Sequence, residues 1–175
     1  MKIYIELIKQ ILKEGGQITD CENFTSKFIM NLKASFEDLL ECDLYFEGKL
    51  PDDYKYFLNF FDGGDLFNYN DIGGFAFFSS KRIIHENKFQ RENHKENDLE
   101  EYWDNNVILF ATFICGDAEY LGFRIKENKE YDILDLTLYE PPSEWRIIDN
   151  SFDNFVEKLI KEKGKPYWFY SPYSS

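Results

Sequence analysis

Residues 50–64 read LPDDYKYFLNFFDGG and carry the strongest helix signal in the chain. Pro51 suits the first turn of a helix, where its missing N–H is not needed, and the two acids after it lie at the positive end of the helix dipole. Apolar side chains then recur at helical spacing and predict a buried stripe of Tyr54, Phe57, Leu58 and Phe61. The pair Gly63-Gly64 ends the helix, and we expect one of these glycines to have a positive φ.

The residues before this segment predict further helices. Residues 2–13 place apolar side chains on one helical face, and Gly15-Gly16 follows them as a C-terminal stop. Residues 17–34 are less regular, and their apolar side chains could line a second helix. Ser35 begins a capping box, which predicts a short helix running to about Cys42. We expect this helix to carry three apolar side chains inward: Phe36, Leu39 and Leu40.

After residue 64 the pattern changes from helical to strand-like. Short apolar or alternating runs separated by turn residues predict strands, and the polar residues 90–104 predict a loop. Ser79-Ser80 and Ser151 are candidate helix caps. The predicted strands cover residues 75–78, 107–113, 119–125 and 131–136, and the predicted helices cover residues 81–89 and 152–163.

These elements predict a single α+β domain over residues 1–175. It has N-terminal helices, an antiparallel or mixed β-sheet meander and a C-terminal helix. The segment 164–175 follows the last helix as a tail rich in proline and tyrosine, which is either disordered or packed against the core.

The charge balance limits the kinds of partner. The chain has 20 Lys+Arg and 33 Asp+Glu, which gives a net charge of −13. Residues 37–71 hold ten acids and two bases, and residues 105–145 hold eight acids and three bases. Nucleic-acid phosphates and anionic membrane surfaces repel such a chain, whereas a basic protein attracts it. We therefore expect a protein partner, with no nucleic acid and no membrane.

The sequence also predicts a cytoplasmic protein. It lacks a run of 18 apolar residues, and residues 1–7 are charged within their apolar stretch, unlike a signal peptide. The three cysteines, Cys21, Cys42 and Cys115, are far apart and form no CxxC pair. Reduced thiols in the cytoplasm fit this pattern better than a disulfide framework or a zinc site.

Signals for catalysis are weak. The chain has no phosphate-binding, nucleophile-elbow or dinucleotide-binding motif, and its two histidines, His85 and His94, are nine residues apart. Two carboxylate pairs are conceivable, Asp132 with Asp135 and Asp117 with Glu119, but solvated acids explain them better. We predict that the protein is not an enzyme and has no catalytic residue, no cofactor and no metal.

Several motifs resemble the SUKH superfamily, which includes fungal cell-wall-synthesis regulators and bacterial immunity proteins of polymorphic toxin systems. LPDDYKYFL followed by DGG resembles its hallmark, with Asp62 where asparagine is common. Downstream, the run VILFA, the Gly116-Asp117 turn, the following aromatic strand and the SFDNF helix start resemble the rest of the family pattern. The resemblance covers about residues 36–160. The polar insert at 90–104, the tail and Cys115 depart from it.

The resemblance implies a binding module rather than an enzyme. Bacterial members are implied to bind and neutralise a cognate toxin inside the producing cell, and a basic nuclease is a toxin class that fits the charge. The alternative is a regulatory or scaffold module of the cell-wall-regulator type, without a toxin partner. A toxin gene directly upstream would separate the two.

We predict one acidic rim as the partner-binding site. Carboxylates near the two chain reversals would meet a basic patch on the partner, and Trp145 would supply an apolar anchor beside them. The predicted acids are Asp62, Asp65, Asp71, Asp117 and Glu119.

Overall fold

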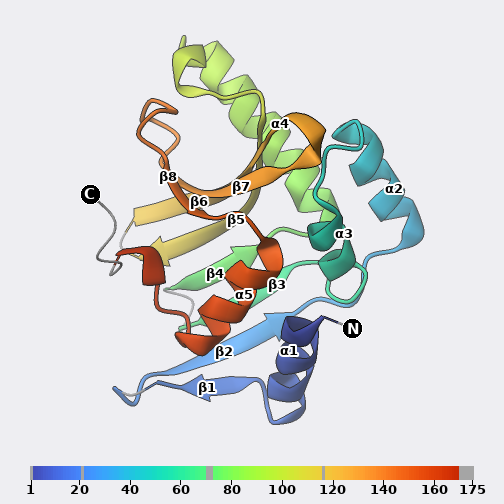
Figure 1. Cartoon of the computed structure of the whole chain (residues 1–175), viewed down its shortest axis with the longest axis vertical. Coiled ribbons are helices and arrows are strands. Elements are labelled where there is room, and N and C mark those ends of the chain that lie inside the picture. Colours follow the sequence, from blue (N-terminus) through green and yellow to red (C-terminus); the bar gives the residue numbers. More distant parts are fainter. Residues whose placement is uncertain (1, 21, 70–72, 116, 170–175) are drawn as a thin grey trace.

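The computed structural model describes residues 2–20, 22–69, 73–115 and 117–169, and these residues form an α+β domain (Figure 1). Within them lie five α-helices and eight β-strands. The helices are α1 (Ile3–Lys13), α2 (Phe36–Tyr45), α3 (Asp52–Leu58), α4 (Ser80–Glu96) and α5 (Phe152–Lys161). The strands are β1 (Gln17–Thr19), β2 (Thr25–Met30), β3 (Gly64–Asn68), β4 (Gly74–Phe77), β5 (Val107–Cys115), β6 (Asp117–Ile125), β7 (Tyr131–Leu136) and β8 (Arg146–Asp149).

The eight strands form one sheet in which each strand pairs with the next one along the chain. All seven pairings are antiparallel, so the predicted meander is confirmed and the sheet is not mixed. Register shifts interrupt three of these pairings, including β5–β6 between Leu109 and Ala111. Such bulges bend and twist a sheet, and the strands in Figure 1 curve around α5.

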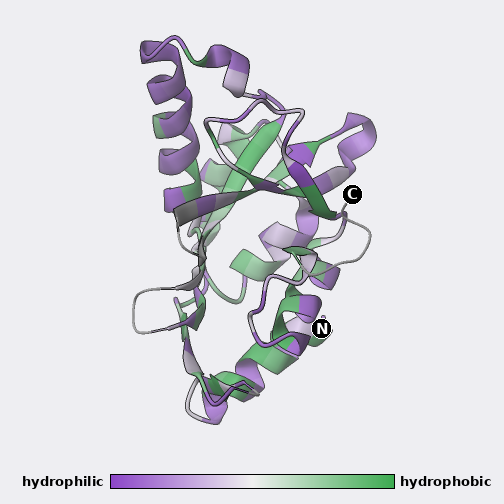
Figure 2. Ribbon diagram, turned by 90° about the vertical axis from the view of Figure 1, so that its left-hand side faces the viewer, coloured by the Kyte–Doolittle hydropathy of each residue, from purple (hydrophilic) through white to green (hydrophobic). Residues whose placement is uncertain are grey.

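Helices α4 and α5 lie on opposite sides of the central strands (Figures 1 and 2). On the α5 side, aromatic rings from the sheet and from α5 form the centre of the core. Phe110 and Phe123 stack with ring centroids 4.1 Å apart, and Phe152 meets Phe110 edge to face at 5.9 Å. The buried stripe predicted within residues 50–64 is confirmed, since all four of its side chains lie in this core.

Helix α4 attaches to the sheet through polar groups. Asn87 is fully buried; its amide nitrogen donates to the Leu109 carbonyl, and its amide oxygen accepts the Leu109 N–H, both at 2.8 Å. His94, one turn from the end of α4, is also buried. The prediction of a loop from residue 90 is therefore wrong up to residue 96. Apart from Ile83, the buried side chains of α4 are polar (Ser80, Asn87, Gln90 and His94), so a search for apolar side chains at helical spacing does not find this helix.

Residues 17–34 form the hairpin β1–β2, not the second helix that their apolar side chains suggested. The Asp20 carboxylate accepts the backbone N–H groups of Glu22 at 2.8 Å and Phe24 at 3.0 Å, which closes a turn. Ile18 and Thr19, both β-branched, suit the strand that enters this turn.

Helix α2 begins at the predicted residue, but the face that it buries differs from the predicted one. The Ser35 hydroxyl accepts the Asp38 N–H, so the predicted cap is confirmed. The inward face consists of Leu39, which packs against the core, and the buried Cys42, a free thiol whose pKa is raised to about 12 by burial. Phe36 and Leu40, predicted to point inward, are exposed. At 100° per residue, Leu40 projects about 130° and Phe36 about 90° from the direction midway between Leu39 and Cys42, so both lie outside the buried face.

The segment after α5 lies against the sheet as far as the structure describes it. Trp168 is buried and packs edge to face on Phe113, with ring centroids 5.6 Å apart. Its indole N–H donates to the Asp135 carboxylate at 2.7 Å. Of the two alternatives for the tail, packing against the core therefore holds for residues 167–169.

Candidate protein-binding site

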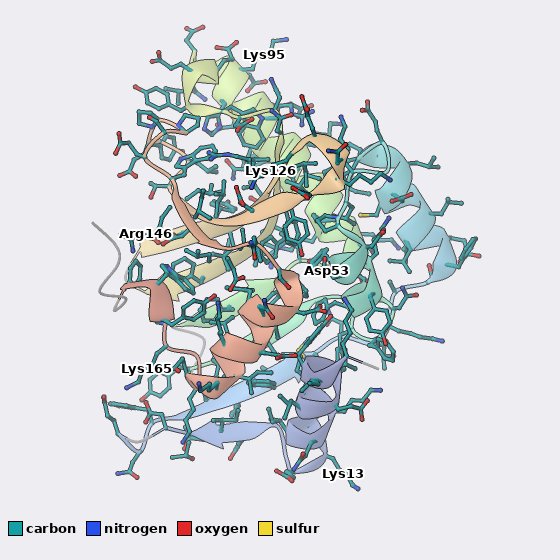
Figure 3. All side chains as sticks on the ribbon, in the orientation of Figure 1. Lys13, Asp53, Lys95, Lys126, Arg146 and Lys165 are labelled. Carbon is teal, nitrogen blue, oxygen red and sulfur yellow. The ribbon has the colours of Figure 1, made fainter. Side chains whose placement is uncertain are left out.

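The LPDDY segment ties α3 to the rest of the fold through Asp53. Its carboxylate accepts the hydroxyl of Tyr131 from β7 and, at 3.3 Å, the backbone N–H of Phe152 (Figure 3). That N–H also donates to the Tyr131 oxygen at 2.8 Å. Burial, together with the Asp53 carboxylate, raises the pKa of Tyr131, so its hydroxyl remains a donor. An acid at the first turn of α5 also complements the helix dipole.

The next residue, Tyr54, links α3 to the two central strands. Its side chain is fully buried, and its hydroxyl lies 2.7 Å from the carbonyl oxygen of Phe78 and 3.3 Å from that of Phe110. Burial raises the pKa of this phenol well above its ordinary value. The aromatic ring fills the core, and the hydroxyl donates to backbone carbonyls there. The structure therefore explains why tyrosine occupies this position.

The Asp62-Gly63-Gly64 segment also makes its contacts with other parts of the same chain. The Asp62 carboxylate accepts the N–H of Ser80 at 2.6 Å and so stabilises the first turn of α4. Gly63 and Gly64 have φ values of +73° and +135°, which confirms the predicted positive φ. The prediction that this pair ends the helix is wrong: α3 ends at Leu58, where the Phe60 N–H donates to the Phe57 carbonyl at 2.9 Å and tightens the last turn. A Cβ on Gly63 would lie 2.6 Å from the Phe77 carbonyl oxygen, and one on Gly64 would lie 2.5 Å from that of Ile29. Neither position has room for a side chain.

A cavity of about 460 Å³ opens beside the LPDDY segment. Its lining mixes charges, with Lys2, Lys49 and Lys129 opposite Asp52 and Asp53. Two of these lysines form ion pairs with acids, Lys2 with Asp153 at 2.9 Å and Lys49 with Glu47 at 2.8 Å. The cavity therefore has no single sign of charge that would select an ionic ligand.

The predicted rim is divided between two faces of the sheet. Asp65 on β3 pairs with Ala76, which pairs with Thr112, which pairs with Tyr120 on β6. Side chains of paired residues point to the same face, and successive residues of a strand point to opposite faces. Glu119 therefore lies on the α5 face, whereas Asp65 lies on the α4 face. The structure does not bring these two acids together.

Glu119 lies beside another acid and is only partly buried. It lies on the same face as Asp135 of β7, because Leu121 pairs with Asp135 and lies two residues from Glu119. Burial, and then the hydrogen bond with Asp135, raises the pKa of Glu119 to about 7. The Asp135 carboxylate also accepts the Trp168 N–H, so we place the shared proton on Glu119. Two carboxyl groups that share a proton carry one negative charge between them.

The remaining members of the predicted rim lie in different environments. Trp145 is buried, and its indole N–H lies 3.1 Å from the carbonyl oxygens of Thr137 and Glu140. Its side chain thus packs in the core and presents no exposed anchor. Asp71 and the side chain of Asp117 lie outside the described residues. Asp62 and Asp65 are close in sequence, but Asp62 caps α4 and Asp65 accepts a hydrogen bond from Asn68 at 3.1 Å.

Across residues 2–20, 22–69, 73–115 and 117–169, no three His, Cys, Asp or Glu side chains are grouped so as to hold a metal ion. Within the same part of the chain, no helix is long and apolar enough to span a membrane. His85, one of the two histidines, stacks on Phe89 at the surface of α4.

The sequence that contains α3 and its neighbours matches a known family. The SMI1 / KNR4 family (SUKH-1) matches residues 33–158, and this range contains the LPDDY and DGG segments. The chain belongs to this family. It is also 25% identical over 179 residues to YobM, an uncharacterized protein of Bacillus subtilis (strain 168), covering 96% of this chain and 90% of that protein. SUKH-1 membership therefore confirms the resemblance drawn from the sequence.

The SUKH-1 motif in this chain is an architectural element. Asp53, Tyr54 and Asp62 each direct their polar atoms to another part of the same chain, and the two glycines allow strands to approach closely. Sequence reasoning found these residues but not their partners. The available signal was Asp62, an acid directly before the Gly63-Gly64 turn. Asp53 lies within the first turn of α3, and nothing near it in the sequence indicates its partner on α5.

Proposed function

We propose that this protein binds and neutralises a cognate polymorphic toxin inside the cell that produces it. The observation that carries this proposal is the SUKH-1 match over residues 33–158 in a chain with a net charge of −13. Family membership favours a protein-binding module, and the negative charge favours a basic partner such as a nuclease. No catalytic role is needed for this function, because occupying the toxin's site suffices.

Electrostatic steering supports an inhibitor of this kind. A strongly acidic protein is attracted to a basic partner over distances up to about the Debye length, ~8 Å at physiological salt. The attraction raises the association rate and falls with salt, whereas buried contacts set the dissociation rate. Of the described rim acids, Asp65 is the one to test, because changing Asp62 removes a helix cap and changing Glu119 alters a carboxyl pair.

We expect a toxin gene directly upstream of the gene for this chain, and absence of such a gene would favour the regulatory-module alternative. The test is a survival assay with the toxin domain which that gene encodes. The domain is expressed from an inducible promoter in a host that lacks the immunity gene, with and without this protein. We expect the protein to restore growth and to bind the purified domain with an association rate that falls as salt rises. Failure to restore growth together with failure to bind would overturn the toxin assignment and favour the regulatory-module alternative.

The charge mechanism is tested separately by surface-plasmon kinetics. Asp65→Asn should slow association by a small factor and reduce its salt dependence, while the dissociation rate stays close to that of the parent. Glu130→Gln, at an exposed carboxyl in the turn before β7, is the matched control for loss of one negative charge. An association rate of the parent that does not change with salt would rule out the steering mechanism while leaving neutralisation intact.

A further inference from the structure

Helix α2 exposes a continuous apolar stripe. Phe36, Leu40 and Leu44 follow one another at intervals of four residues, so they lie on one face of the helix. Their exposed fractions are 75%, 47% and 69%. The opposite face of α2 holds Leu39 and Cys42 and packs inward, so these three side chains have no place in the core. We call them the α2 stripe.

The stripe is bordered by carboxylates. Helix α2 contains four acids and no base. At 100° per residue, Glu37 and Glu41 project beside Leu40 and Leu44 on one border of the stripe. Asp43 lies on the other border, where its carboxylate pairs with Lys55 at 3.0 Å. Glu37 and Glu41 are exposed, so the border they form is negative and open to solvent.

This combination selects the kind of surface that can cover the stripe. A second copy of the chain, packed stripe against stripe, would bring the Glu37 and Glu41 carboxylates of both copies together, and like charges repel. The same carboxylates oppose an anionic membrane surface. An amphipathic helix with aliphatic side chains on one face and Lys or Arg beside them would satisfy both the apolar stripe and its acidic border.

We propose that the α2 stripe is the docking surface for a partner protein, and that the partner presents an amphipathic segment with aliphatic side chains flanked by Lys or Arg. The inference deepens the proposed function and rests on it only in taking the natural partner to be a toxin. Apolar side chains at the centre of such a contact hold the complex together, and the acidic border orients the incoming basic segment.

The first experiment needs no natural partner. The probe is a fluorescein-labelled helical peptide of leucine and lysine, with leucine at positions i, i+3, i+4 and i+7, and its binding is followed by fluorescence polarisation. We expect the double variant Phe36→Gln/Leu44→Gln to bind at least tenfold more weakly than the parent. The control double variant Ile3→Gln/Ile147→Gln removes two other exposed apolar side chains without changing the charge, and it should bind as the parent does.

The acidic border is tested with the same peptide. Glu37→Gln/Glu41→Gln should weaken binding and flatten its dependence on salt, and a peptide with glutamate in place of lysine should not bind the parent. If the stripe and control variants bind the leucine–lysine peptide equally well, the peptide is held by general charge attraction and the proposal is wrong. Sedimentation of the parent as a dimer that Leu44→Gln dissociates would show that a second copy covers the stripe, which also overturns it.

The survival assay separates this inference from the proposed function. If the parent restores growth and the stripe variant does not, while circular dichroism shows both folded, the stripe is part of the toxin interface. If both restore growth equally, the toxin is neutralised elsewhere on the protein, and the docking assignment fails while the proposed function stands. If the parent itself fails, the proposed function falls, and the peptide measurements still decide what the stripe binds.

Discussion

Helices α2 and α3 are neighbours in sequence, and both have acids in their first turn. They differ in whether their side chains contact the rest of the fold or face solvent. Around α3 the polar groups are satisfied inside the molecule: Asp53 at α5, Tyr54 at the sheet and Asp62 at α4. On α2 the apolar side chains of Phe36 and Leu44 face solvent. The difference indicates that the segment most typical of the family builds the fold, whereas the surface free to bind a partner lies next to it.

The largest effect we expect is at Gly63. Gly63→Ala should lower the free energy of unfolding by about 3 kcal/mol or more, because the new Cβ would meet backbone atoms 2.6 Å away at a positive φ. Gly48→Ala is the matched control, since Gly48 has a φ of +69° but no heavy atom within 4 Å, and it should cost about 1 kcal/mol. Urea denaturation measures both. Equal losses for the two variants would show that the strands do not approach closely at Gly63.

Tyr54→Phe should have the next largest effect. It removes a hydroxyl from between two buried carbonyl oxygens and should cost about 1–2 kcal/mol of stability. Tyr45→Phe, at the exposed end of α2, should change stability by less than about 0.5 kcal/mol. A small effect at Tyr54 in the same denaturation experiment would mean that this hydroxyl does not tie α3 to the sheet.

Glu119→Gln should change the dependence of stability on pH. The pKa of Glu119 is raised from 4.5 to about 7 in the folded protein, so between these values the folded state holds a proton that the unfolded state has released. Stability contributed by this proton is therefore lost as pH rises from about 4.5 to 7. The glutamine variant does not lose it, and with allowance for solvent screening it should exceed the parent by about 1 kcal/mol at pH 8.

The same variant should differ less from the parent at pH 4.5, where Glu119 is protonated in both the folded and, in part, the unfolded state. Denaturation midpoints at the two pH values give the comparison, with Glu130→Gln as the control at an exposed carboxyl. A constant difference between Glu119→Gln and the parent across this range would contradict the shared proton at Glu119 and Asp135.

The smallest effect on stability should come from the α2 stripe. Phe36→Gln and Leu44→Gln should each change the free energy of unfolding by less than about 0.5 kcal/mol, because both side chains are already in water. Leu39→Gln, on the inward face of the same helix, should cost several times more. If the stripe variants destabilise as much as Leu39→Gln does, the stripe packs within the protein and is not a free surface.

The sequence predicts those helices and strands in which apolar side chains recur with a clear helical or strand period. Residues 50–64 have both an apolar helical period and two glycines, and the alternation in residues 131–136 predicts β7 correctly. The hydroxyls of Ser35 and Ser151 cap α2 and α5 as expected. In each case the information is local, because the neighbouring residues suffice to determine the backbone conformation.

Other features depend on contacts between distant residues and could not be predicted this way. The inward side chains of α4 include Asn87 and His94, whose partners lie on β5 and in the segment after β7. The separation of Asp65 from Glu119, two of the predicted rim acids, has a similar reason. Which face each acid occupies follows from the pairing of Asp65, Ala76, Thr112 and Tyr120 across four strands, and no local pattern in the sequence encodes that register.

The shortness of the outermost strands bears on how the protein behaves at high concentration. An open sheet ends in unpaired backbone groups that invite another chain to add a strand and begin an aggregate. Here β1 has three residues and β8 has four, and the Lys163 ammonium group donates to the Thr19 carbonyl at 2.9 Å. With so little edge to extend and a charge of −13 on every copy, the fold resists polymerisation. We therefore expect the concentrated protein to form no fibres.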